Sequence, residues 1–589
     1  MKKNLLKSLA FAAITTLSFA PVAAQTAAGP SPIWAKIVDT PNADMAVATA
    51  VNDKAVYTYF RPGIKKATDG ISYDGKEISV GGFDMIGNST NNNFLLTKSD
   101  RDGNLLWSIN STFGDFYNSG TIANTHDGGA LVGFTFRHTN GMLTEKIGFK
   151  DAKGKTTEFD WTLPETGKRY DKAAVMKVSA EGEIEWIRTI SPDGTYPFAT
   201  GDVQIAGLAE SEDNSLYVAA QFCDTITVDT PDGSEAKTYY PSNEQGGNAL
   251  IAKYSANGDL LKVVTSTSSN AVSENIGGLR YADGNLYTFG YVKGNADAAA
   301  QYNFGEGLAP VEVPDSAVYN LVASKFNTDL VPQWTRLFPG SKVNKSSIIQ
   351  LRGIDVAGTD VFLTGNIRGQ IKGDNNEVTF ATAADQKLYE GFIARVSADN
   401  GDLLAGTTSS VDYGNKGIAG YSNALVFSGK PNTVYAYGYE LSGNLYLRAY
   451  DRQTLAAVAD GQWDLAKGVS SLQNITASGD TLFSLFRVQN GNSSLTDGTA
   501  LNAEAYGAAL VAFKLPAGTV TGIASTLADN VVSLSAARGS LTITATKPQV
   551  VTVYAADGRT VANVSVNGTA TVALPAGIYV AAGQKAVVK

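Results

Sequence analysis

The chain contains almost none of the residues that build metal and redox centres. Among its 589 residues there are one cysteine and two histidines. A single cysteine allows no intrachain disulfide, and it excludes the cysteine clusters that hold zinc or iron–sulfur centres. Two histidines argue equally against a histidine-rich metal site. We therefore expect neither a bound metal nor a cofactor.

Charge is also scarce. Only 17% of the residues are charged and the formal net charge is −9, so the chain lacks the basic footprint that a nucleic-acid partner requires. Aromatic residues at 10% argue against a disordered or coiled-coil protein. The length exceeds what one small core can serve, which predicts several domains or one large repetitive architecture.

The N-terminus has the pattern of a secretory signal peptide. Three lysines within residues 2–7 precede an apolar run over 8–20, and small residues at 22–24 supply a cleavage site. A buried N-terminal helix is the alternative. The run is too short to span a membrane, and no other stretch reaches about 18 consecutive apolar residues. We expect residues 1–24 to be removed, the protein to be exported, and no transmembrane segment.

Glycine is abundant, with 60 residues, and it punctuates a repeat of about 70 to 80 residues. Each copy holds an apolar strand that ends in a base, then a polar turn and a second strand, as in a β-hairpin. A glycine stands five residues after the first three bases, and a tryptophan stands nine residues after the first, second and fourth. The bases are Lys98, Lys177, Lys253, Lys325 and Arg395.

A second element, a turn followed by an alternating strand, recurs upstream of each hairpin. Apolar residues at every second position indicate half-buried strands. With an apolar strand before each turn, every unit holds four short strands. The seven copies of this element cover residues 52–60, 127–135, 213–221, 283–291, 359–367, 431–439 and 479–487.

Four antiparallel strands repeated seven times predict an all-β fold, a seven-bladed β-propeller over residues 25–520. The last unit ends near Leu515 without a fourth strand, whereas residues 33–38 form an unassigned strand that contains Trp34. We expect this N-terminal strand to complete the seventh blade and close the ring, because closure removes exposed sheet edges. An open β-solenoid is the alternative, but it requires neither seven units nor a leftover strand at each end.

The unit resembles the bacterial seven-bladed propeller repeat, in which D-x-F-V-A-K-x-x-x-x-G-x-x-x-W is followed by D-x-x-G-x-x-Y-x-x-G. The resemblance covers about residues 31–515 and is weakest in the sixth unit, where Ala449 replaces the base. Some repeats of pyrroloquinoline-quinone dehydrogenases look similar, so the resemblance also keeps an enzyme among the alternatives.

Insertions between the second and third strands distinguish the units from one another. In up-and-down blades these connections emerge on one face of the disc, where propellers usually bind their ligands. Either the insertions form hairpins that pack on neighbouring blades, or their aromatic side chains contact a glycan or a protein. On the second interpretation the binding residues are Phe149, Phe159, Trp161, Tyr239, Tyr240, Tyr302, Phe304, Phe380 and Tyr389.

Candidate catalytic residues are few, and we predict none. His126 and His138 lie 12 residues apart around one strand and cannot share a metal if that strand is extended. Cys223 follows a strand and is typical of a small packing residue. Asp100 and Asp213 stand in the turns that hairpins need, without the EF-hand pattern for calcium.

The repeat stops near residue 522, and residues 521–589 are predicted to form a small β-sandwich. This tail resembles the C-terminal sorting domain of type IX (Por) secretion in Bacteroidetes, with V-x-V-Y-x-x-x-G-R, then L-P-x-G-I-Y, then a basic end. The resemblance implies export by the outer-membrane secretion machinery and removal of the tail; a plain terminal sandwich is the alternative. The residues that carry it are Val551, Val553, Tyr554, Gly558, Arg559, Leu574, Pro575, Gly577, Tyr579 and Lys589.

Together these features predict a secreted or cell-surface propeller that binds a glycan or a protein through loops on one face. The alternative is an enzyme, either a carbohydrate-active propeller with acidic residues around its funnel or a quinoprotein-like oxidoreductase. A purely structural role in a surface layer is the third hypothesis.

Overall fold

The structure is a computed structural model in which the chain divides into two compact units, Met1–Ala517 and Gly518–Lys589. The predicted signal peptide, residues 1–24, lies outside the described residues. The structure describes residues 29–66, 68–80, 91–112, 116–137, 146–160, 170–192, 201–229, 237–239, 247–269, 271, 273–314, 318–343, 345–373, 378–382, 389–409, 418–427, 430–440, 443–515, 532–555, 559–581 and 584–588.

The described part of the first unit is built from antiparallel strands, which form seven successive four-stranded groups. The first three are β2 (Met45–Val51), β3 (Ala55–Arg61), β8 (Leu95–Asp100), β9 (Leu105–Ser111); β10 (Phe116–Asn124), β11 (Ala130–Arg137), β14 (Tyr170–Val178), β15 (Ile184–Pro192); and β16 (Gly201–Glu210), β17 (Leu216–Phe222), β20 (Asn248–Tyr254), β21 (Leu260–Ser269). The next two are β22 (Ser273–Ala282), β23 (Asn285–Lys293), β26 (Tyr319–Asn327), β27 (Pro332–Phe338); and β29 (Ile348–Ala357), β30 (Asp360–Arg368), β33 (Glu390–Ser397), β34 (Leu403–Thr408). The last two are β35 (Ile418–Val426), β36 (Thr433–Glu440), β37 (Leu445–Asp451), β38 (Ala457–Lys467); and β39 (Val469–Ser478), β40 (Thr481–Gln489), β43 (Tyr506–Lys514), β1 (Ser31–Asp39).

These groups are the blades of a β-propeller, so the predicted all-β propeller fold is confirmed. The order within each blade follows the chain, and the first strand of each blade lines the centre of the ring. Buried hydrophobic side chains form the cores between blades, as in the cluster that joins the first two blades through Tyr59, Phe94 and Phe134. Among the described residues no helix is long and apolar enough to cross a membrane.

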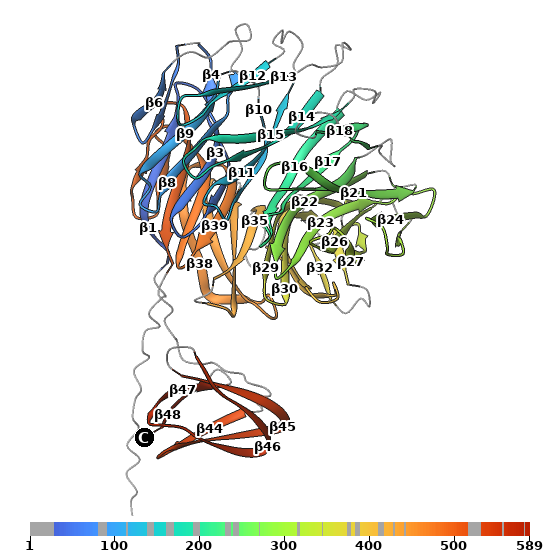
Figure 1. Ribbon diagram of the computed structural model, residues 1–589, viewed down its shortest axis with the longest axis vertical. Helices are drawn as coiled ribbons and strands as arrows, with labels where there is room; N and C mark the ends of the chain where they lie inside the picture. The colour runs from blue at the N-terminus through green and yellow to red at the C-terminus, as the bar shows by residue number, and fades with distance from the viewer. Residues whose placement is uncertain are drawn as a thin grey trace, which may run out of the picture. The chain divides into compact units, whose positions relative to one another are not determined.

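The N-terminal strand closes the ring. β1 pairs antiparallel with β43 from Ser31 opposite Lys514 to Val38 opposite Ala508, and it is the fourth strand of the seventh blade. Figure 1 shows the blue first strands of the propeller beside its orange last strands. The expectation drawn from the leftover strand at each end of the repeat is therefore confirmed.

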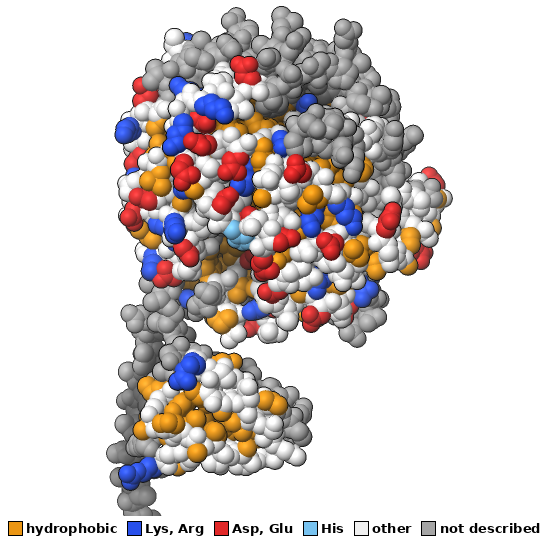
Figure 2. Space-filling model, viewed as in Figure 1, with side chains coloured by type: hydrophobic (Ala, Val, Ile, Leu, Met, Phe, Trp, Pro, Cys, Tyr) orange, Lys and Arg blue, Asp and Glu red, His pale blue; other side chains and the backbone are white. Residues whose placement is uncertain are grey.

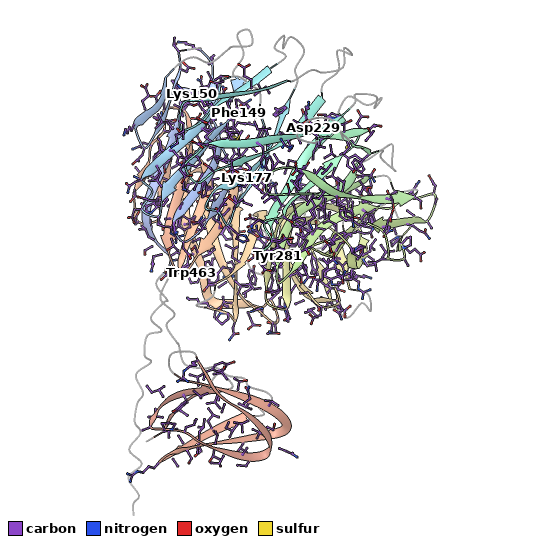
Figure 3. The ribbon with its side chains drawn as sticks, viewed as in Figure 1. Phe149, Lys150, Lys177, Asp229, Tyr281 and Trp463 are labelled. Carbon is purple, nitrogen blue, oxygen red and sulfur yellow. The ribbon has the colours of Figure 1, made fainter. Side chains whose placement is uncertain are left out.

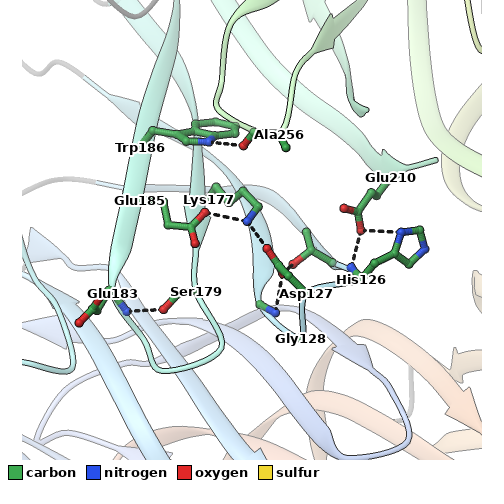
Figure 4. Close-up of polar contacts among 12 residues, drawn as sticks. His126, Asp127, Gly128, Lys177, Ser179, Glu183, Glu185, Trp186, Glu210 and Ala256 are labelled. Atoms are coloured by element: carbon green, nitrogen blue, oxygen red, sulfur yellow. Dashed lines mark hydrogen bonds and ion pairs between the residues drawn. The ribbon is translucent and has the colours of Figure 1, made fainter. Parts of the chain in front are cut away.

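Repeated tryptophans join four of the blades to the blade that follows each of them. In three blades the indole N–H donates to a backbone carbonyl in the turn between the third and fourth strands of the following blade. Trp34 does the same across the closure and donates to the carbonyl of Arg101 at 2.9 Å. The same interblade contact thus recurs around the ring. The three pairs are Trp107 with Ala180 at 3.0 Å, Trp186 with Ala256 at 3.0 Å (Figure 4) and Trp334 with Ala398 at 3.3 Å.

Six insertions contain short hairpins or strand pairs, and most of them extend the preceding blade. β12, for example, pairs with β9, the outer strand of the blade before it, and β24 pairs with β21 in the same way. β31 instead pairs with β28 (Gly340–Ser341), which follows β27. The hairpins are β5 (Gly70–Tyr73) with β6 (Lys76–Val80), β12 (Lys146–Lys150) with β13 (Thr156–Asp160), β18 (Ile226–Val228) with β19 (Lys237–Tyr239), β24 (Ala300–Phe304) with β25 (Val311–Val313), β31 (Gln370–Lys372) with β32 (Thr379–Ala381), and β41 (Ser493–Leu495) with β42 (Ala500–Leu501). The remaining short strands of this unit are β4 (Gly63–Ile64) and β7 (Asn91–Asn92), which pair with each other.

The second unit is a five-stranded antiparallel sheet around its own core. A long central strand, β45, pairs with β46 along one edge, and with β44 and then β47 along the other. Its buried core includes Ile543, Val553, Val566 and Tyr579. The strands are β44 (Val532–Ala537), β45 (Ser540–Ala555), β46 (Thr560–Ala573), β47 (Gly577–Ala581) and β48 (Gln584–Val588).

Candidate functional site

Four of the nine aromatic residues predicted to bind a ligand are buried in the packing of the inserted hairpins. Phe149 is fully buried against Phe94, with ring centroids 5.2 Å apart, and lies on β12 (Figure 3). Phe304 packs edge-on against Phe326 at 5.1 Å, and Phe380 stacks on Phe392 at 5.8 Å.

Burial corrects the expectation for four of the nine residues. Phe149, Tyr302, Phe304 and Phe380 are at most 5% exposed, so they offer a ligand no surface. The structure supports the alternative, that the insertions are hairpins packed on neighbouring blades. Tyr239 and Tyr389 are half-buried. The side chain of Phe159, and Trp161 and Tyr240 entirely, lie outside the described residues.

The sorting-motif residues account for the packing of the C-terminal unit. Val551, Val553, Leu574 and Tyr579 are buried in its core, and the Tyr579 hydroxyl donates to the carbonyl of Pro575 at 3.0 Å. Apolar side chains also gather on the visible face of this unit in Figure 2. Tyr554 is 40% exposed. Arg559 and Pro575 are exposed, Gly577 lies against the ring of Tyr579, and Gly558 and Lys589 lie outside the described residues. A sorting role for these residues stays a prediction.

The centre of the propeller holds two adjoining cavities, of about 330 and 90 Å³. They share four lining residues, and together they receive side chains or backbone from the inner strands of all seven blades. We call them the central channel. Volumes of this order suit a small molecule. The larger cavity is lined by the C-terminal halves of β2, β10 and β16, so it lies toward the turns that follow the inner strands, on the face opposite the insertions.

A β-bulge interrupts the pairing of six inner strands at the level of the smaller cavity. In β29, for example, Leu351 pairs with Gly365 and Gly353 with Thr364, which leaves Arg352 as the extra residue. Bulges of this kind redirect a side chain and recur next to functional sites. The extra residues in strand order are Val47, Ala206, Gly277, Arg352, Ser422 and Gln473.

Arg352 is the one charged residue among these bulges, and it lines the smaller cavity. Its side chain is exposed to water, yet the surrounding protein desolvates the guanidinium and lowers the pKa of Arg352. Among the described residues no hydrogen bond or ion pair reaches it. Arg280, which lines both cavities, differs: its Nε donates to the carbonyl of Ile354 at 3.0 Å and lies 3.9 Å from Asp355.

Most of the remaining polar groups of the channel are uncharged. Asn124, Asn474 and Thr476 line the larger cavity, and Asn423 and Gln473 the smaller one. The Oδ1 atom of Asn124 is buried without a hydrogen-bond partner among the described residues. Tyr281, labelled in Figure 3, adds an aromatic ring to the same lining.

A carboxylate and an imidazole lie where the larger cavity meets the turns. The backbone N–H of His126 donates to Oε2 of Glu210 at 2.6 Å, and its Nδ1 lies 3.5 Å from the same oxygen (Figure 4). Burial raises the pKa of Glu210, and the hydrogen bond from His126 opposes this rise. His126 remains exposed, and His138 lies outside the described residues.

Other candidates from the sequence have structural partners. The carboxylate of Asp100 accepts the backbone N–H groups of Asp102 and Asn104, and that of Asp213 accepts the hydroxyl of Ser211, as turns require. Among the described residues, no group of three or more histidine, cysteine, aspartate or glutamate side chains could hold a metal ion.

The sequence reasoning missed the channel, although a signal for it is present. Three inner strands share a four-residue motif around their bulges: IAGL at 205–208, IGGL at 276–279 and LRGI at 351–354. Alignment of these strands shows an arginine where the others carry alanine or glycine. The repeat was recognised from its hairpins and tryptophans. An alignment of those elements does not include the inner strands, where the arginine lies.

Comparisons with known proteins bear on the fold alone. No protein-family model matches the chain, and no curated protein matches it. Similar solved structures include a quinohemoprotein alcohol dehydrogenase from Pseudomonas putida HK5, at 11% identity and a TM-score of 0.35 over 82% of this chain and 76% of that one. A europium-containing methanol dehydrogenase matches at 10% identity and a TM-score of 0.34, over 80% of this chain and 89% of that one. Virginiamycin B lyase from Staphylococcus aureus matches at 10% identity and a TM-score of 0.27, over 80% of this chain and 99% of that one. We transfer none of these activities to this chain.

Proposed function

We propose that this chain is an exported propeller that binds a saccharide in its central channel without transforming it. The observation that carries the proposal is the channel itself, a cavity of small-molecule size whose polar lining comes mainly from amides and hydroxyls. Sugar hydroxyls donate and accept hydrogen bonds, and amide and hydroxyl side chains do the same. An aromatic ring such as that of Tyr281 supplies the apolar contact that orients a ligand.

The binding face is the main change from the sequence-based hypothesis. Aromatic residues of the insertion hairpins are buried in packing contacts, as Phe149 and Phe304 illustrate. The channel, by contrast, is lined by polar side chains, among them those of Thr121, Asn474 and Thr476. A rigid ring that holds such groups in fixed positions suits selective binding.

The enzymatic alternative has no specific support in the channel. Among the described residues, Glu210 is the carboxylate that lines the channel, and it lies beside His126. Glycoside cleavage requires two carboxyl groups placed across one bond. We therefore keep the binding hypothesis.

Export is part of the proposal and rests on the sequence. The signal-peptide pattern and the sorting resemblance both point out of the cytoplasm, and the resemblance implies removal of the chain from about residue 520. Intact-mass analysis of the protein released from the surface of cells that produce it tests this. A mass that still includes Lys589 contradicts the proposed removal.

Blocking the channel tests the binding proposal. Thr121 lines both cavities, so Thr121→Trp fills the space where they join. The matched control, Gln301→Trp, places the same bulk on an exposed position of hairpin β24–β25. On an array of neutral and acidic oligosaccharides we expect the channel variant to lose binding and the control to retain it. The reverse result supports the insertion face instead.

A further inference from the structure

The bulge in β29 is the starting point, because it places a residue that differs in kind from its counterparts. At the equivalent positions of the five other bulged strands the extra residue is uncharged: Val47, Ala206, Gly277, Ser422 and Gln473. Neighbouring strands approach closely here, since a Cβ on Gly277 would lie 2.4 Å from the Cβ of Leu351. Among these six bulges, Arg352 alone places a charged side chain at this level of the channel.

The contrast with Arg280 indicates that Arg352 is not there to stabilise the fold. Arg280 has a carbonyl and a carboxylate as partners, whereas Arg352 has none among the described residues. The Arg352 side chain is exposed to water in the channel, and the surrounding protein partly desolvates its guanidinium. Its charge therefore forms no contact that the fold of the described residues depends on, and it is open to a ligand in the cavity.

A guanidinium in a cavity has a well-defined complementary ligand. Its planar N–H groups match the oxygens of a carboxylate or a sulfate ester, which accept two parallel hydrogen bonds. Uncharged hydrogen-bonding groups surround it, among them Asn423, Gln473 and Asn474 on the inner strands of the sixth and seventh blades. The larger cavity continues past Arg280 toward Tyr281, with room for the rest of a small molecule.

No broad surface patch competes with the channel for an anion on the described face of the propeller in Figure 2, where Lys and Arg side chains are interspersed with Asp and Glu. The formal net charge of −9 also opposes nonspecific attraction of anions. On this face, recognition of an anion would therefore depend on a local group.

We propose that the ligand of the channel is an acidic saccharide, and that Arg352 binds its carboxylate or sulfate group. This inference rests on the proposed function, because it names the class of saccharide that the channel takes. The neutral lining contacts the sugar hydroxyls, and Arg352 selects for the anionic group.

Binding measured by calorimetry with four probes tests the inference: a galacturonate disaccharide, its methyl ester, a galactose disaccharide carrying a 6-sulfate, and inorganic sulfate. The variants are Arg352→Gln, Arg352→Lys and, as a matched control, Arg336→Gln, whose guanidinium lies on an exposed outer strand and donates to the carbonyl of Asn400. We expect Arg352→Gln to weaken binding of the acidic disaccharides by about 10- to 100-fold and to leave the methyl ester unchanged. Arg352→Lys should give an intermediate loss of affinity, because lysine keeps the charge but lacks the planar pair of N–H donors.

The outcomes separate this inference from the proposed function. If the methyl ester binds as tightly as the acid and Arg352→Gln changes neither affinity, the proposal that the channel binds a saccharide is supported. The proposal that Arg352 binds its anionic group is then contradicted. If inorganic sulfate binds as tightly as the disaccharides, the channel binds an oxyanion, and the proposal that its ligand is a saccharide is contradicted. If no probe binds, both proposals fail. Thermal unfolding checks folding: Arg352→Gln should not lower the Tm, because it removes an unpartnered charge, and a lower Tm with lost binding of every probe would assign Arg352 a structural role.

Discussion

At the scale of single residues, glycines in the hairpin turns serve two purposes. Gly182 has a φ of +84°, a left-handed conformation that residues with a Cβ adopt at a cost. It also lies under the indole of the preceding blade, since a Cβ there would lie 2.8 Å from Trp107. Gly103 and Gly401 repeat this arrangement under Trp34 and Trp334. The turn glycine is thus part of the joint between blades.

A comparison of two glycines separates these purposes. Gly284 has a similar φ of +73°, but a Cβ added there would meet nothing within 4 Å. Gly284→Ala should therefore cost only the backbone strain, about 1–2 kcal/mol of unfolding free energy. Gly182→Ala should cost more, because the tryptophan must move as well. Urea unfolding of both variants checks this, and equal losses would contradict the packing role.

Asp44 is the buried carboxyl whose titration should be visible in stability. Burial raises the pKa of Asp44 to about 8, although it accepts hydrogen bonds from Thr40 and from the backbone N–H of Gly63. A folded-state pKa above the unfolded value means that the folded state binds more protons, so stability falls as the pH rises from about 4 through 8.

The variant Asp44→Asn tests that sign. Its side chain does not titrate, so the difference in Tm between the wild type and the variant should narrow as the pH rises from about 5 to about 8. Asp69→Asn is the control: burial raises the pKa of Asp69, but N–H donors at Lys65 and Lys66 outweigh it and lower that pKa overall. The difference in Tm between the wild type and Asp69→Asn should stay constant in this pH range. A constant difference for Asp44→Asn would show that Asp44 is already ionised.

At the scale of elements, the sequence predicted strands better than it predicted what their side chains contact. Alternating patterns that follow a turn located the second strand of every blade, because these signals are local. The aromatic residues of the insertions could not be divided into buried and exposed ones from the sequence. Which side of a two-stranded hairpin is buried depends on the element it packs against, and the local pattern does not identify that element. Their partner is the outer strand of the preceding blade, about 40 residues earlier for Phe149.

Phe149→Ala tests the corrected role of the insertions. The side chain is fully buried among Phe94, Phe116 and Phe134. Its removal should cost about 3–5 kcal/mol of unfolding free energy. Tyr389→Ala, at a half-buried position, should cost clearly less. Equal, small effects in denaturant unfolding would show that Phe149 does not anchor its hairpin.

The candidate site was harder to foresee than the elements around it. The channel residues come from the inner strands of all seven blades, so no local spacing brings Arg352, Gln473 and Tyr281 together. Their proximity follows from ring closure, and their orientation follows from bulges that insert one residue into an otherwise regular pattern. The arginine within LRGI at 351–354 is visible in the sequence, but its meaning depends on where the inner strands lie.

At the scale of the whole molecule, closure of the ring joins the two ends of the propeller sequence. β1 supplies the outer strand of the seventh blade, and Trp34 joins that blade to the first one. Without β1, β43 would present an open edge with unpaired N–H and C=O groups. The repeat predicted this closure because its units were incomplete at both ends.

Truncation tests closure. A chain that begins at residue 40 lacks β1, whereas one that begins at residue 30 keeps it. We expect the shorter chain to unfold at a markedly lower temperature and to aggregate, because a sheet edge and the contacts of Trp34 are lost. Indistinguishable thermal unfolding of the two chains would contradict a stabilising role for the closing strand.

The central claim is that the channel, and not the insertion face, binds the ligand. The most direct test is a crystal structure of the propeller grown with the galacturonate disaccharide. The account predicts the sugar in the central channel, with its carboxylate on the guanidinium of Arg352 and its far end toward Tyr281. Sugar bound over the insertion hairpins, or an empty channel at saturating disaccharide, would contradict it.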